Sequence, residues 1–347
     1  MSEKRSLMQR LFEPKSIEAQ APVPKIATYA ILIVWTLVVL FPLYWVLVTS
    51  FKAELEVDSG PFYLPFVDFK PNLDAWRFML LENNTLWPYF NSIIVATAST
   101  AFSVLIGALA AYALVRIRFQ VKLAAVGCFL LLLAGVVVAV AAFGTPWPLA
   151  AAIAIALFIV FLGTIGRRFR MALGNNDIEF WMISNRIMPP IVAVLPIYVM
   201  FQKLQLLDTQ LALIATYTAV NLPIVVWLTR DFFAGIPVDL DESAEIDGAS
   251  KFRVFFTIAL PLVRSGLVAT IMLVLILAWN EYLLALFLSN ANAQTMPVLV
   301  SAQNTTRGPQ WWYMSVLIVI MIVPVITIAA FLQKHIARGL LIGAVKG

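Results

Sequence analysis

Residues able to do chemistry are few in this chain and are scattered along it. Cys128 is the only cysteine and His335 the only histidine among the 347 residues. One cysteine cannot form an internal disulfide or a multi-thiol metal site, and a histidine without a second histidine or thiol argues against a metal centre. The chain also lacks a phosphate-binding loop with the Gly-Lys-Ser/Thr signature. We therefore expect no catalytic residue, no metal and no cofactor bound by the chain itself.

Glu281 and Arg186 are the two ionisable residues that lie well inside long apolar stretches. An ionised side chain at mid-bilayer costs about 2.5–3.5 kcal/mol, which makes both functional candidates. Glu281 is expected in the outer half of its span and Arg186 near the inner face, and an axial gap of about 12–15 Å argues against a direct ion pair. Two roles stay open for Glu281 and its neighbours Asn280 and Tyr282: binding hydroxyl groups in a translocation pathway, or bracing the helices. Asn221 is a further pathway candidate that fits helix packing equally well.

A second set of candidates lies in the polar segment 230–264. Asp239 followed three residues later by Glu242 predicts a helix start, Gly248 suits the helix end, and Ser250 can cap a second short helix. Helical spacing predicts one exposed aromatic face on that second helix, formed by Phe252, Phe255 and Phe256. Such a pair of short helices, hinged at a glycine, could seat in a groove of a partner and transmit its motion. The alternative is an amphipathic hairpin on the membrane surface.

The elements that must position these residues are membrane spans. The chain is 62% apolar and 12% charged, with a mean hydropathy of +0.91, whereas soluble domains are about 45–50% apolar and about 25% charged. This composition excludes a soluble globular protein. Crossing a bilayer takes about 20 apolar residues in a helix. Eight stretches qualify, namely 26–49, 92–115, 123–143, 148–165, 180–202, 211–228, 267–288 and 312–332.

The placement of basic residues predicts the topology. With the N-terminus in the cytosol, eighteen of the 24 Lys and Arg residues fall in cytosolic segments, five in outer segments and one, Arg186, within a span. Cytosolic loops carry the excess of positive charge in membrane proteins, so we expect both termini to be cytosolic. The basic residues that give the chain its net charge of +5 lie beside apolar blocks. We therefore interpret this charge as a signal of orientation in the bilayer and expect no nucleic acid as partner.

This topology divides the chain into four parts. Residues 1–25 form a cytosolic tail, and residues 26–121 hold two spans joined by an outer loop at 50–91, which is expected to pack on the outer face or meet a partner there. Residues 122–166 form a transmembrane hairpin. Residues 167–347 hold four further spans, the cytosolic loop 230–264 and a C-terminal tail at 333–347.

The cytosolic loop resembles the EAA motif of permease subunits of binding-protein-dependent ABC importers. That motif is Glu-Ala-Ala, three residues, Gly, nine residues, then Ile-x-Leu-Pro, and this chain departs from it only by a serine at the first alanine. In that family the loop docks into a cleft on the ATPase subunit. The resemblance implies the same role for Glu242, Ser243, Ala244, Asp247, Gly248, Ala249, Ser250, Phe252, Phe255, Ile258, Leu260 and Pro261.

Other segments are similar to the carbohydrate-uptake branch of the family, in particular to its second permease subunit. They are the stretch 180–196 with its prolines, the Trp-Asn-Glu-Tyr run at 279–282 and the tail 343–347. The resemblance covers residues 25–120 loosely and 174–347 closely, but it does not cover 122–166. It implies an all-α polytopic bundle of six core spans, to which the charge-free hairpin is an addition. Either the hairpin is a lipid-facing structural pair, or it holds an additional membrane partner.

The function implied by the resemblance is import of a sugar or sugar alcohol across the cytoplasmic membrane of a bacterium or archaeon. The implied partners are a second permease subunit in a heterodimer, an ATPase dimer that holds ATP and Mg2+, and an extracytoplasmic sugar-binding protein. One rival is an ion-coupled secondary transporter, which predicts inverted repeats and several midplane acids. Another is a membrane-embedded enzyme, which requires a cluster of acids, histidines or nucleophiles. The sequence shows neither pattern.

Overall fold

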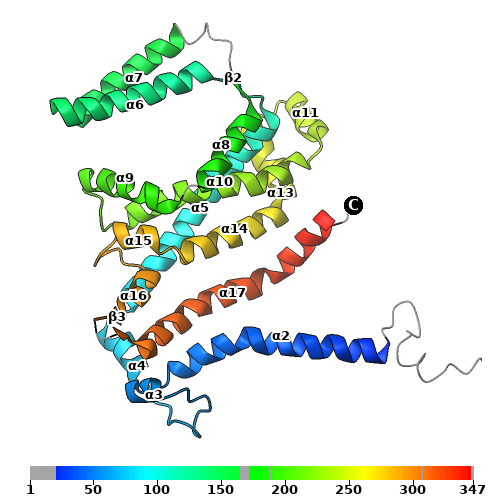
Figure 1. The fold of residues 1–347 in the computed structure, drawn as a ribbon. Helices are drawn as coiled ribbons and strands as arrows, with labels where there is room; N and C mark the ends of the chain where they lie inside the picture. Colours follow the sequence, from blue (N-terminus) through cyan, green and yellow to red (C-terminus); the bar gives the residue numbers. More distant parts are fainter. Residues whose placement is uncertain (1–20, 165–171, 188, 307, 345–347) are drawn as a thin grey trace, which may run out of the picture. The chain divides into compact units, whose positions relative to one another are not determined.

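The computed structural model describes residues 21–164, 172–187, 189–306 and 308–344, and helices dominate them (Figure 1). The chain divides into two compact units. The first comprises Met1–Phe90 and Thr295–Ile326, and the second comprises Asn91–Gln294 and Thr327–Gly347. The predicted N-terminal tail lies almost wholly outside the described residues, as does the link at 165–171.

The first unit contains the first long helix and the elements that follow it. Helix α2 begins with a proline in its first turn, a position where the missing N–H costs nothing. A buried apolar cluster holds the unit together, formed by Ala75, Met79, Met296, Leu299, Trp312, Val316 and Leu317. The elements are α2 (Pro22–Thr49), α3 (Glu54–Asp58), α4 (Asp74–Arg77), the π-helix η1 (Phe78–Glu82), α16 (Met296–Ala302), β3 (Asn304–Thr305), β4 (Gly308–Pro309) and the start of α17 (Trp311–Ala344).

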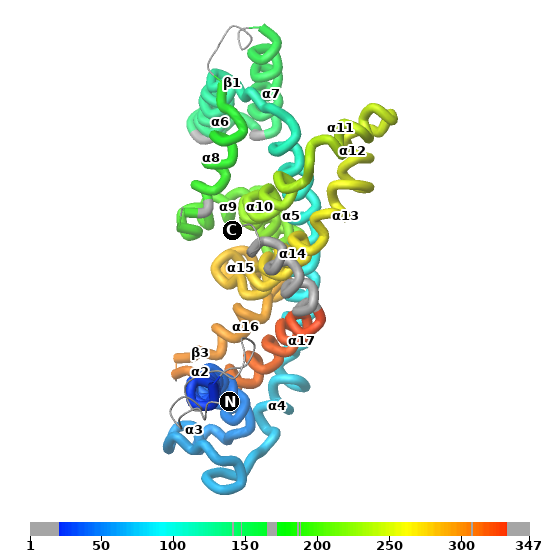
Figure 2. The backbone as a smooth tube through the Cα atoms, turned by 90° about the vertical axis from the view of Figure 1, so that its right-hand side faces the viewer, coloured from blue at the N-terminus to red at the C-terminus, as the bar shows by residue number. Residues whose placement is uncertain are grey.

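The second unit contains the remaining helices. Helix α10 packs against α8, α14 and α15, and in Figure 2 the segment α11–α12 projects from the end of α10 as a compact knob. The elements are α5 (Leu86–Arg116), which starts in the first unit, β1 (Val121–Lys122), α6 (Leu123–Phe143), α7 (Trp147–Gly163), β2 (Ala172–Leu173), α8 (Asn175–Ile187), α9 (Pro190–Lys203), α10 (Gln210–Ala234), α11 (Val238–Ile246), α12 (Lys251–Val254), the π-helix η3 (Phe255–Ala259), α13 (Leu260–Leu262), α14 (Arg264–Trp279) and α15 (Leu283–Leu288).

Among the described residues, five helices are long and apolar enough to cross a membrane: α2, α5, α6, α10 and α17. Two bent pairs raise the number to seven if each pair is one span, and they are Asn175–Asn185 with Pro190–Lys203, bent by 88°, and Lys251–Leu262 with Arg264–Trp279, bent by 84°. Helix α7 is apolar but shorter, with Pro148–Gly163 as its apolar part. The eight predicted spans therefore correspond to five to seven long apolar helices and one short one.

Two of the predicted continuous spans are broken. The stretch 180–202 changes direction at Pro189 and Pro190, since a proline has no N–H to donate and its ring displaces the preceding turn. The stretch 267–288 stops at Trp279 and resumes at Leu283. The first break follows from the proline pair, and the second falls at Asn280 and Glu281, the polar residues within that apolar stretch.

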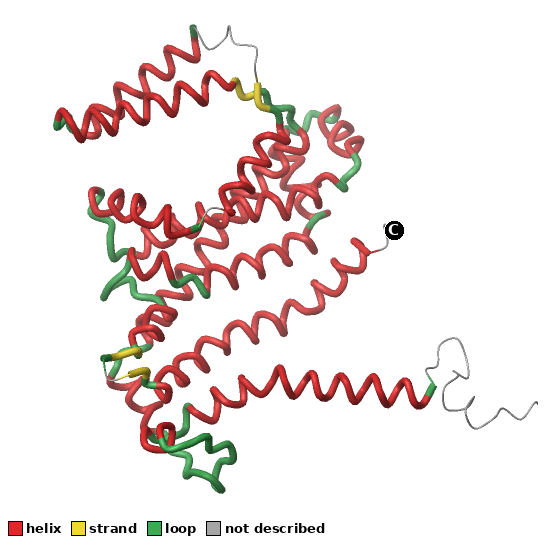
Figure 3. Tube along the Cα trace, viewed as in Figure 1, coloured by secondary structure: helices red, strands yellow, loops and turns green. Residues whose placement is uncertain are grey.

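The hairpin formed by α6 and α7 is attached through a narrow base. Figure 3 shows the short antiparallel pair β1–β2, in which Val121 lies opposite Leu173 and Lys122 opposite Ala172. Beside it, the Asn175 side chain accepts a hydrogen bond from the Phe119 backbone at 2.8 Å and donates to the Ile117 carbonyl at 2.7 Å. These hydrogen bonds hold the end of α5 and the start of α8 together, and the hairpin is attached where these two helices meet.

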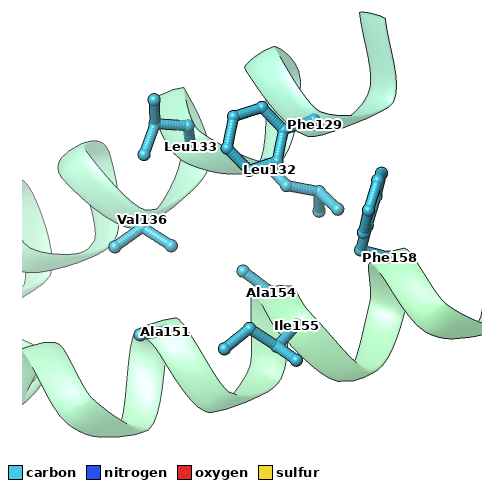
Figure 4. Close-up of a pocket in the computed structure, with 8 residues that line it drawn as sticks. All are labelled: Phe129, Leu132, Leu133, Val136, Ala151, Ala154, Ile155 and Phe158. Carbon is cyan, nitrogen blue, oxygen red and sulfur yellow. The ribbon is translucent and has the colours of Figure 1, made fainter. Parts of the chain in front are cut away.

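Helices α6 and α7 of the hairpin pack on each other. Gly144, with φ +62°, ends α6 in the left-handed conformation, and Phe129 meets Phe158 edge to face at 5.8 Å. Figure 4 shows the groove between the two helices, lined by Phe129, Leu132, Leu133, Val136, Ala151, Ala154, Ile155 and Phe158. The lining is wholly apolar.

Candidate coupling site and pathway residues

The first helix of the polar segment, α11, begins differently from the prediction. Pro237 occupies the N-cap position and α11 starts at Val238, so Asp239 lies inside the first turn together with Asp241. The expected capping role of Asp239 is wrong, because the fixed φ of the proline already sets the entry into the helix. The two acids remain favourable there, since negative charge near a helix N-terminus interacts with the helix dipole.

The helix ends at the predicted glycine. Gly248 has φ +84°, its N–H donates to the Glu245 carbonyl at 3.0 Å, and the N–H of Ala249 donates to the Ala244 carbonyl at 2.9 Å. This pair of hydrogen bonds is the Schellman motif, which favours glycine at the left-handed position. Nothing lies within 4 Å of a Cβ placed on Gly248, so the glycine is required by backbone conformation alone.

The second short helix carries the predicted cap but only part of the predicted aromatic face. The hydroxyl of Ser250 accepts the N–H of Arg253 at 3.3 Å. Phe252 and Phe256 are exposed, at 69% and 47%, whereas Phe255 is buried at 1%. The prediction that Phe255 belongs to the exposed face is wrong. Residues from Phe255 onward form a π-helical turn, and Phe255 packs on the rings of Tyr112 and Phe233, at 5.3 and 5.9 Å.

The remaining residues of the motif are mostly accessible. Glu242, Ser243, Asp247 and Pro261 are exposed, while Ala244, Ala249, Ile258 and Leu260 are half-buried. Exposed apolar side chains accompany them on α11, α12 and η3. We call this set the coupling surface, and it consists of Leu240, Ile246, Phe252 and Phe256.

The knob is anchored to α5 by a contact that the sequence did not reveal. Arg116, at the end of α5, pairs through Nε with Asp241 of α11, and the two side chains are only 8% and 6% exposed. Arg116 also donates to the Ile236 carbonyl at 2.8 Å, and the Tyr112 hydroxyl donates to Asp241 at 3.3 Å. The partners are 125 residues apart, so no local spacing could have linked them. The arrangement makes α5 part of the support of the coupling surface.

A second ion pair lies nearby on α10. Arg230 Nε lies 2.7 Å from Glu179 Oε1 of α8, with about a third of the arginine side chain exposed. Exposed pairs of this kind contribute little to stability. This pair joins α10 to α8, whereas the buried pair of Arg116 and Asp241 joins the knob to α5.

The pathway candidates lie at the break after α14. Glu281 accepts the N–H of Leu284 at 3.0 Å and so caps the start of α15, and its backbone carbonyl accepts the Tyr217 hydroxyl of α10 at 3.3 Å. Asn280 is exposed and donates to the Ile276 carbonyl at 2.9 Å. Glu281 therefore lies outside any continuous span, and its carboxylate accepts a hydrogen bond from the first turn of α15.

The other pathway candidates stand in different environments. Tyr282 is partly exposed, at 37%, and Asn221 is buried in α10, at 5%. The structure brings Asn280, Glu281 and Tyr282 together in one non-helical turn, which joins α10 through Tyr217. The side chain of Arg186, the other ionisable candidate, lies outside the described part of the chain.

The turn between α9 and α10 holds a second polar assembly that sequence reasoning missed. The carboxylate of Asp208 accepts hydrogen bonds from the backbones of Asn290, Asn292 and Ala293 at 2.7–3.1 Å. Burial by itself raises the pKa of Asp208, but these hydrogen bonds, Ala293 first, outweigh it, so that pKa lies below its usual value. Asp208 is therefore an anion, and its hydrogen bonds hold the loop that follows α15.

A neighbouring amide pair reinforces this loop. Asn91 donates to the carbonyls of Asn292 and Gln294 at 2.9 and 3.0 Å, and Gln210 donates to Asn91 at 2.6 Å. Within the described residues, no group of three or more His, Cys, Asp and Glu side chains could hold a metal ion.

Comparison with known proteins identifies relatives along nearly the whole chain. Residues 23–342 match the family model described as binding-protein-dependent transport system inner membrane component. The trehalose/maltose transport system permease protein of Thermococcus litoralis is 30% identical over 91% of this chain and 94% of its own length. A diacetylchitobiose uptake system permease protein of Streptomyces coelicolor is 28% identical over 89% of this chain and 85% of its own.

A solved structure shares the fold. It is a bacterial ABC transporter involved in the import of the acidic polysaccharide alginate, matched with a TM-score of 0.62 and 19% identity over 96% of this chain and 99% of the other.

Proposed function

The chain belongs to the family of binding-protein-dependent transport system inner membrane components, and we propose that it forms the translocation pathway for a sugar or sugar alcohol together with a second permease subunit. As a multi-pass inner membrane component, the chain is a transport subunit and not an enzyme. ATP and Mg2+ belong to a separate ATPase dimer in this proposal, and an extracytoplasmic binding protein delivers the substrate.

The observation that carries the proposal is the geometry of the α11–α12 knob. Its coupling surface exposes apolar side chains to the surroundings, including Ile246 at 86% and Phe252 at 69%. Exposed apolar patches bounded by polar residues are typical of protein interaction sites. Behind the surface, the buried pair of Arg116 and Asp241 joins the knob to α5. Motion imposed on the knob by an ATPase would therefore be passed to α5 as well as to α10 and α14, which flank it in the chain.

Rigid displacement of helices around a central pathway is an established way to alternate access between two sides of a membrane. In the proposed cycle, closure of the ATPase dimer moves the knob, and the helices attached to it reorient. Eight membrane crossings with both termini in the cytosol would place the knob on the ATPase side. The distribution of basic residues supports that topology.

The sugar or polyol substrate class is supported by the named substrates of the relatives, trehalose/maltose and diacetylchitobiose. For this chain we propose Asn221, Asn280, Glu281 and Tyr282 as pathway residues. Asn280 and Tyr282 are accessible in the non-helical turn, where hydroxyl groups of a sugar could meet an amide and an aromatic ring. Glu281 supports that turn through its hydrogen bond to Leu284.

The test of the proposal is binding-protein-stimulated ATP hydrolysis by the assembled transporter carrying Gly248→Asp. We expect loss of stimulated hydrolysis and of transport, because an aspartate at φ +84° distorts the turn between α11 and α12 and adds a negative charge beside the coupling surface. Gly144→Asp is the matched control, since Gly144 also has positive φ, at +62°, and open space around its Cβ, but lies at the tip of the hairpin. Full stimulation in the Gly248 variant would exclude the proposed role of the knob.

A further inference from the structure

The first unit contains a cavity that the proposed function leaves unused. It has a volume of about 360 Å3 and lies where the end of α2 meets the start of α17. Ligand pockets in proteins have volumes of about 300–1,000 Å3. Thr49 is the last residue of α2 and Trp311 the first of α17, and both helices are candidate membrane spans. The cavity therefore lies at the level where spans meet water.

Three polar side chains line the cavity, Lys52, Thr49 and Ser315, and each can donate a hydrogen bond. Lys52 is 2% exposed and lines the cavity, and its Nζ lies 4.4 Å from the centre of the Trp45 ring and 5.2 Å from that of Phe69. Among the described residues, its ammonium group has no carboxylate within 4.0 Å and no hydrogen-bond acceptor. A buried ammonium without an acceptor costs free energy, so an acceptor in the cavity would be favourable.

A second side chain in the same wall lacks a partner. Thr49 is 3% exposed, and its hydroxyl is buried without a hydrogen-bond partner among the described residues. Other helical threonines, such as Thr36 and Thr216, donate to the carbonyl four residues earlier. The hydroxyl of Thr49 does not, and it lies in the wall of the cavity beside Lys52.

Two carboxylates near Lys52 are already committed elsewhere. Glu56 accepts the backbone N–H of Ala53 at 2.9 Å, and Asp68 accepts those of Tyr63 and Leu64, each at 2.9 Å. Burial lowers the pKa of Lys52, while the charges of Glu56 and Asp68 act to raise it. Both acids thus favour the charged ammonium at a distance and leave its N–H groups free to bind a ligand.

The other lining residues give the cavity an amphipathic character. Trp45 and Trp311 flank it, and Met314 and Ile318 extend it along α17. Tryptophans concentrate at membrane interfaces because one end of the ring system is apolar and the other polar. Outside the cavity, α2 exposes apolar side chains along its length, Trp35 and Phe41 among them, at 67% and 51%. No carboxylate or amide lines the cavity, so its one charged lining group is the Lys52 ammonium, which favours an anionic ligand over a neutral one.

We propose that this cavity binds the headgroup of a phospholipid, whose phosphate accepts hydrogen bonds from Lys52 and Thr49 and whose acyl chain follows the apolar surface of α2. A phosphate offers acceptor oxygens to a wall that presents donors. Basic pockets between membrane helices bind lipid headgroups on the same principle. The ligand would join the ends of α2 and α17, which are distant in sequence.

The experiment measures lipid binding to the assembled, delipidated transporter in detergent by native mass spectrometry. The probes are phosphatidylglycerol and a galactolipid with the same acyl chains but no phosphate. We expect phosphatidylglycerol to be preferred, and Lys52→Gln to weaken its binding about tenfold, the effect of one charge-assisted hydrogen bond. The control is Lys70→Gln, because Lys70 is an exposed lysine of the same loop, and it should bind as the unaltered protein does.

Thr49→Val provides a second variant that keeps the side-chain shape, and it should also weaken phosphatidylglycerol binding. Thermal unfolding in the presence of inorganic phosphate, and separately of maltose, completes the test. Equal binding of the galactolipid, or unchanged lipid binding in both variants, would overturn the proposal. Stabilisation by inorganic phosphate alone would assign the site to a free anion, and stabilisation by maltose would assign it to the substrate. Loss of lipid binding with ATPase coupling intact separates this site from the proposed function.

Discussion

Asp241, in the first turn of α11, forms a buried ion pair with Arg116, the last residue of α5. One carboxylate oxygen takes part in this pair and accepts the Tyr112 hydroxyl, while the other, Oδ1, finds no partner among the described residues. A buried carboxylate that is only partly satisfied is sensitive to any change in its partner. The pair is the point at which the coupling surface is fixed to a long helix.

Replacement of Asp241 by asparagine should therefore destabilise the assembled transporter, because the Arg116 charge would remain buried without its counterion. Breaking such a pair costs about 3–5 kcal/mol. We expect a lower thermal unfolding temperature together with weaker binding-protein-stimulated ATP hydrolysis. Glu179→Gln, which removes the exposed partner of Arg230, is the control and should change stability by about 1 kcal/mol or less. Equal effects of the two substitutions would contradict the assigned anchor.

The two phenylalanines Phe252 and Phe255 should separate docking from folding. Phe252→Ala removes a ring that is 69% exposed and should reduce co-purification of the ATPase with little loss of stability. Phe255→Ala removes a ring that is 1% exposed and should cost about 3–5 kcal/mol, as large-to-small core changes do. The measurements are thermal unfolding and the amount of ATPase retained on an affinity-tagged permease. A strongly destabilised Phe252 variant would argue against an exposed coupling surface.

Gly107 tests the packing of α5 against α10. A Cβ at Gly107 would lie 2.6 Å from Val225 Cγ1 and 2.8 Å from its Cβ, and Val225 is fully buried. Gly107→Ala should therefore destabilise the protein by about 1–3 kcal/mol. Gly135→Ala is the matched control in a second membrane helix, since nothing lies within 4 Å of its Cβ, and its unfolding temperature should not fall. Insensitivity of stability to Gly107→Ala would show that α5 and α10 are not in close contact.

Asp208 should make stability depend on pH in the acid range. Its pKa in the folded protein lies below its usual value, and that of an unfolded aspartate is about 3.9. The contribution of Asp208 is therefore fully present above the unfolded pKa and is lost as the pH falls through the folded pKa. Unfolding of the parent and of Asp208→Asn, followed from pH 7 to pH 3, should show a difference that is constant above about pH 5 and shrinks below about pH 4. A difference that grows on acidification would have the wrong sign.

The hairpin formed by α6 and α7 should be removable. Lys122 and Ala172 are paired across β1 and β2, so residues 123–171 can be replaced by an Asn-Gly turn, which closes two-residue hairpins. Because Asn175 holds the ends of α5 and α8 together independently of the hairpin, we expect assembly with the ATPase and stimulated hydrolysis to persist. Loss of a co-purifying membrane protein in the deletion variant would instead assign the hairpin to partner binding. Asn175→Ala in the deleted chain should lower stability, which tests the junction between α5 and α8 itself.

Much of this organisation is already encoded locally. A bilayer crossing requires about 20 apolar residues in a helix, and the apolar runs predict the long helices well. Helix α6 coincides with its predicted stretch, and α2 and α5 begin about four and six residues earlier than predicted. The turn at Gly248 was also predictable, since only glycine adopts φ near +84° without strain. Ser250 caps α12 as its residue type and position predict. The resemblance of the loop to the EAA motif indicates the same family as the match over residues 23–342.

Tertiary structure decided the features that depend on residues far apart in the chain. Phe255 was expected on the exposed face because helical spacing is the same whichever side is covered, and only packing on Tyr112 and Phe233 turned it inward. The pair of Arg116 and Asp241 joins positions 125 residues apart, and the burial of Lys52 within the predicted outer loop depends on its contacts with Trp45 and Phe69. Local sequence sets the preference of each segment, but burial and charge pairing arise only when distant segments meet, and the candidate anchor and the lipid cavity both depend on them.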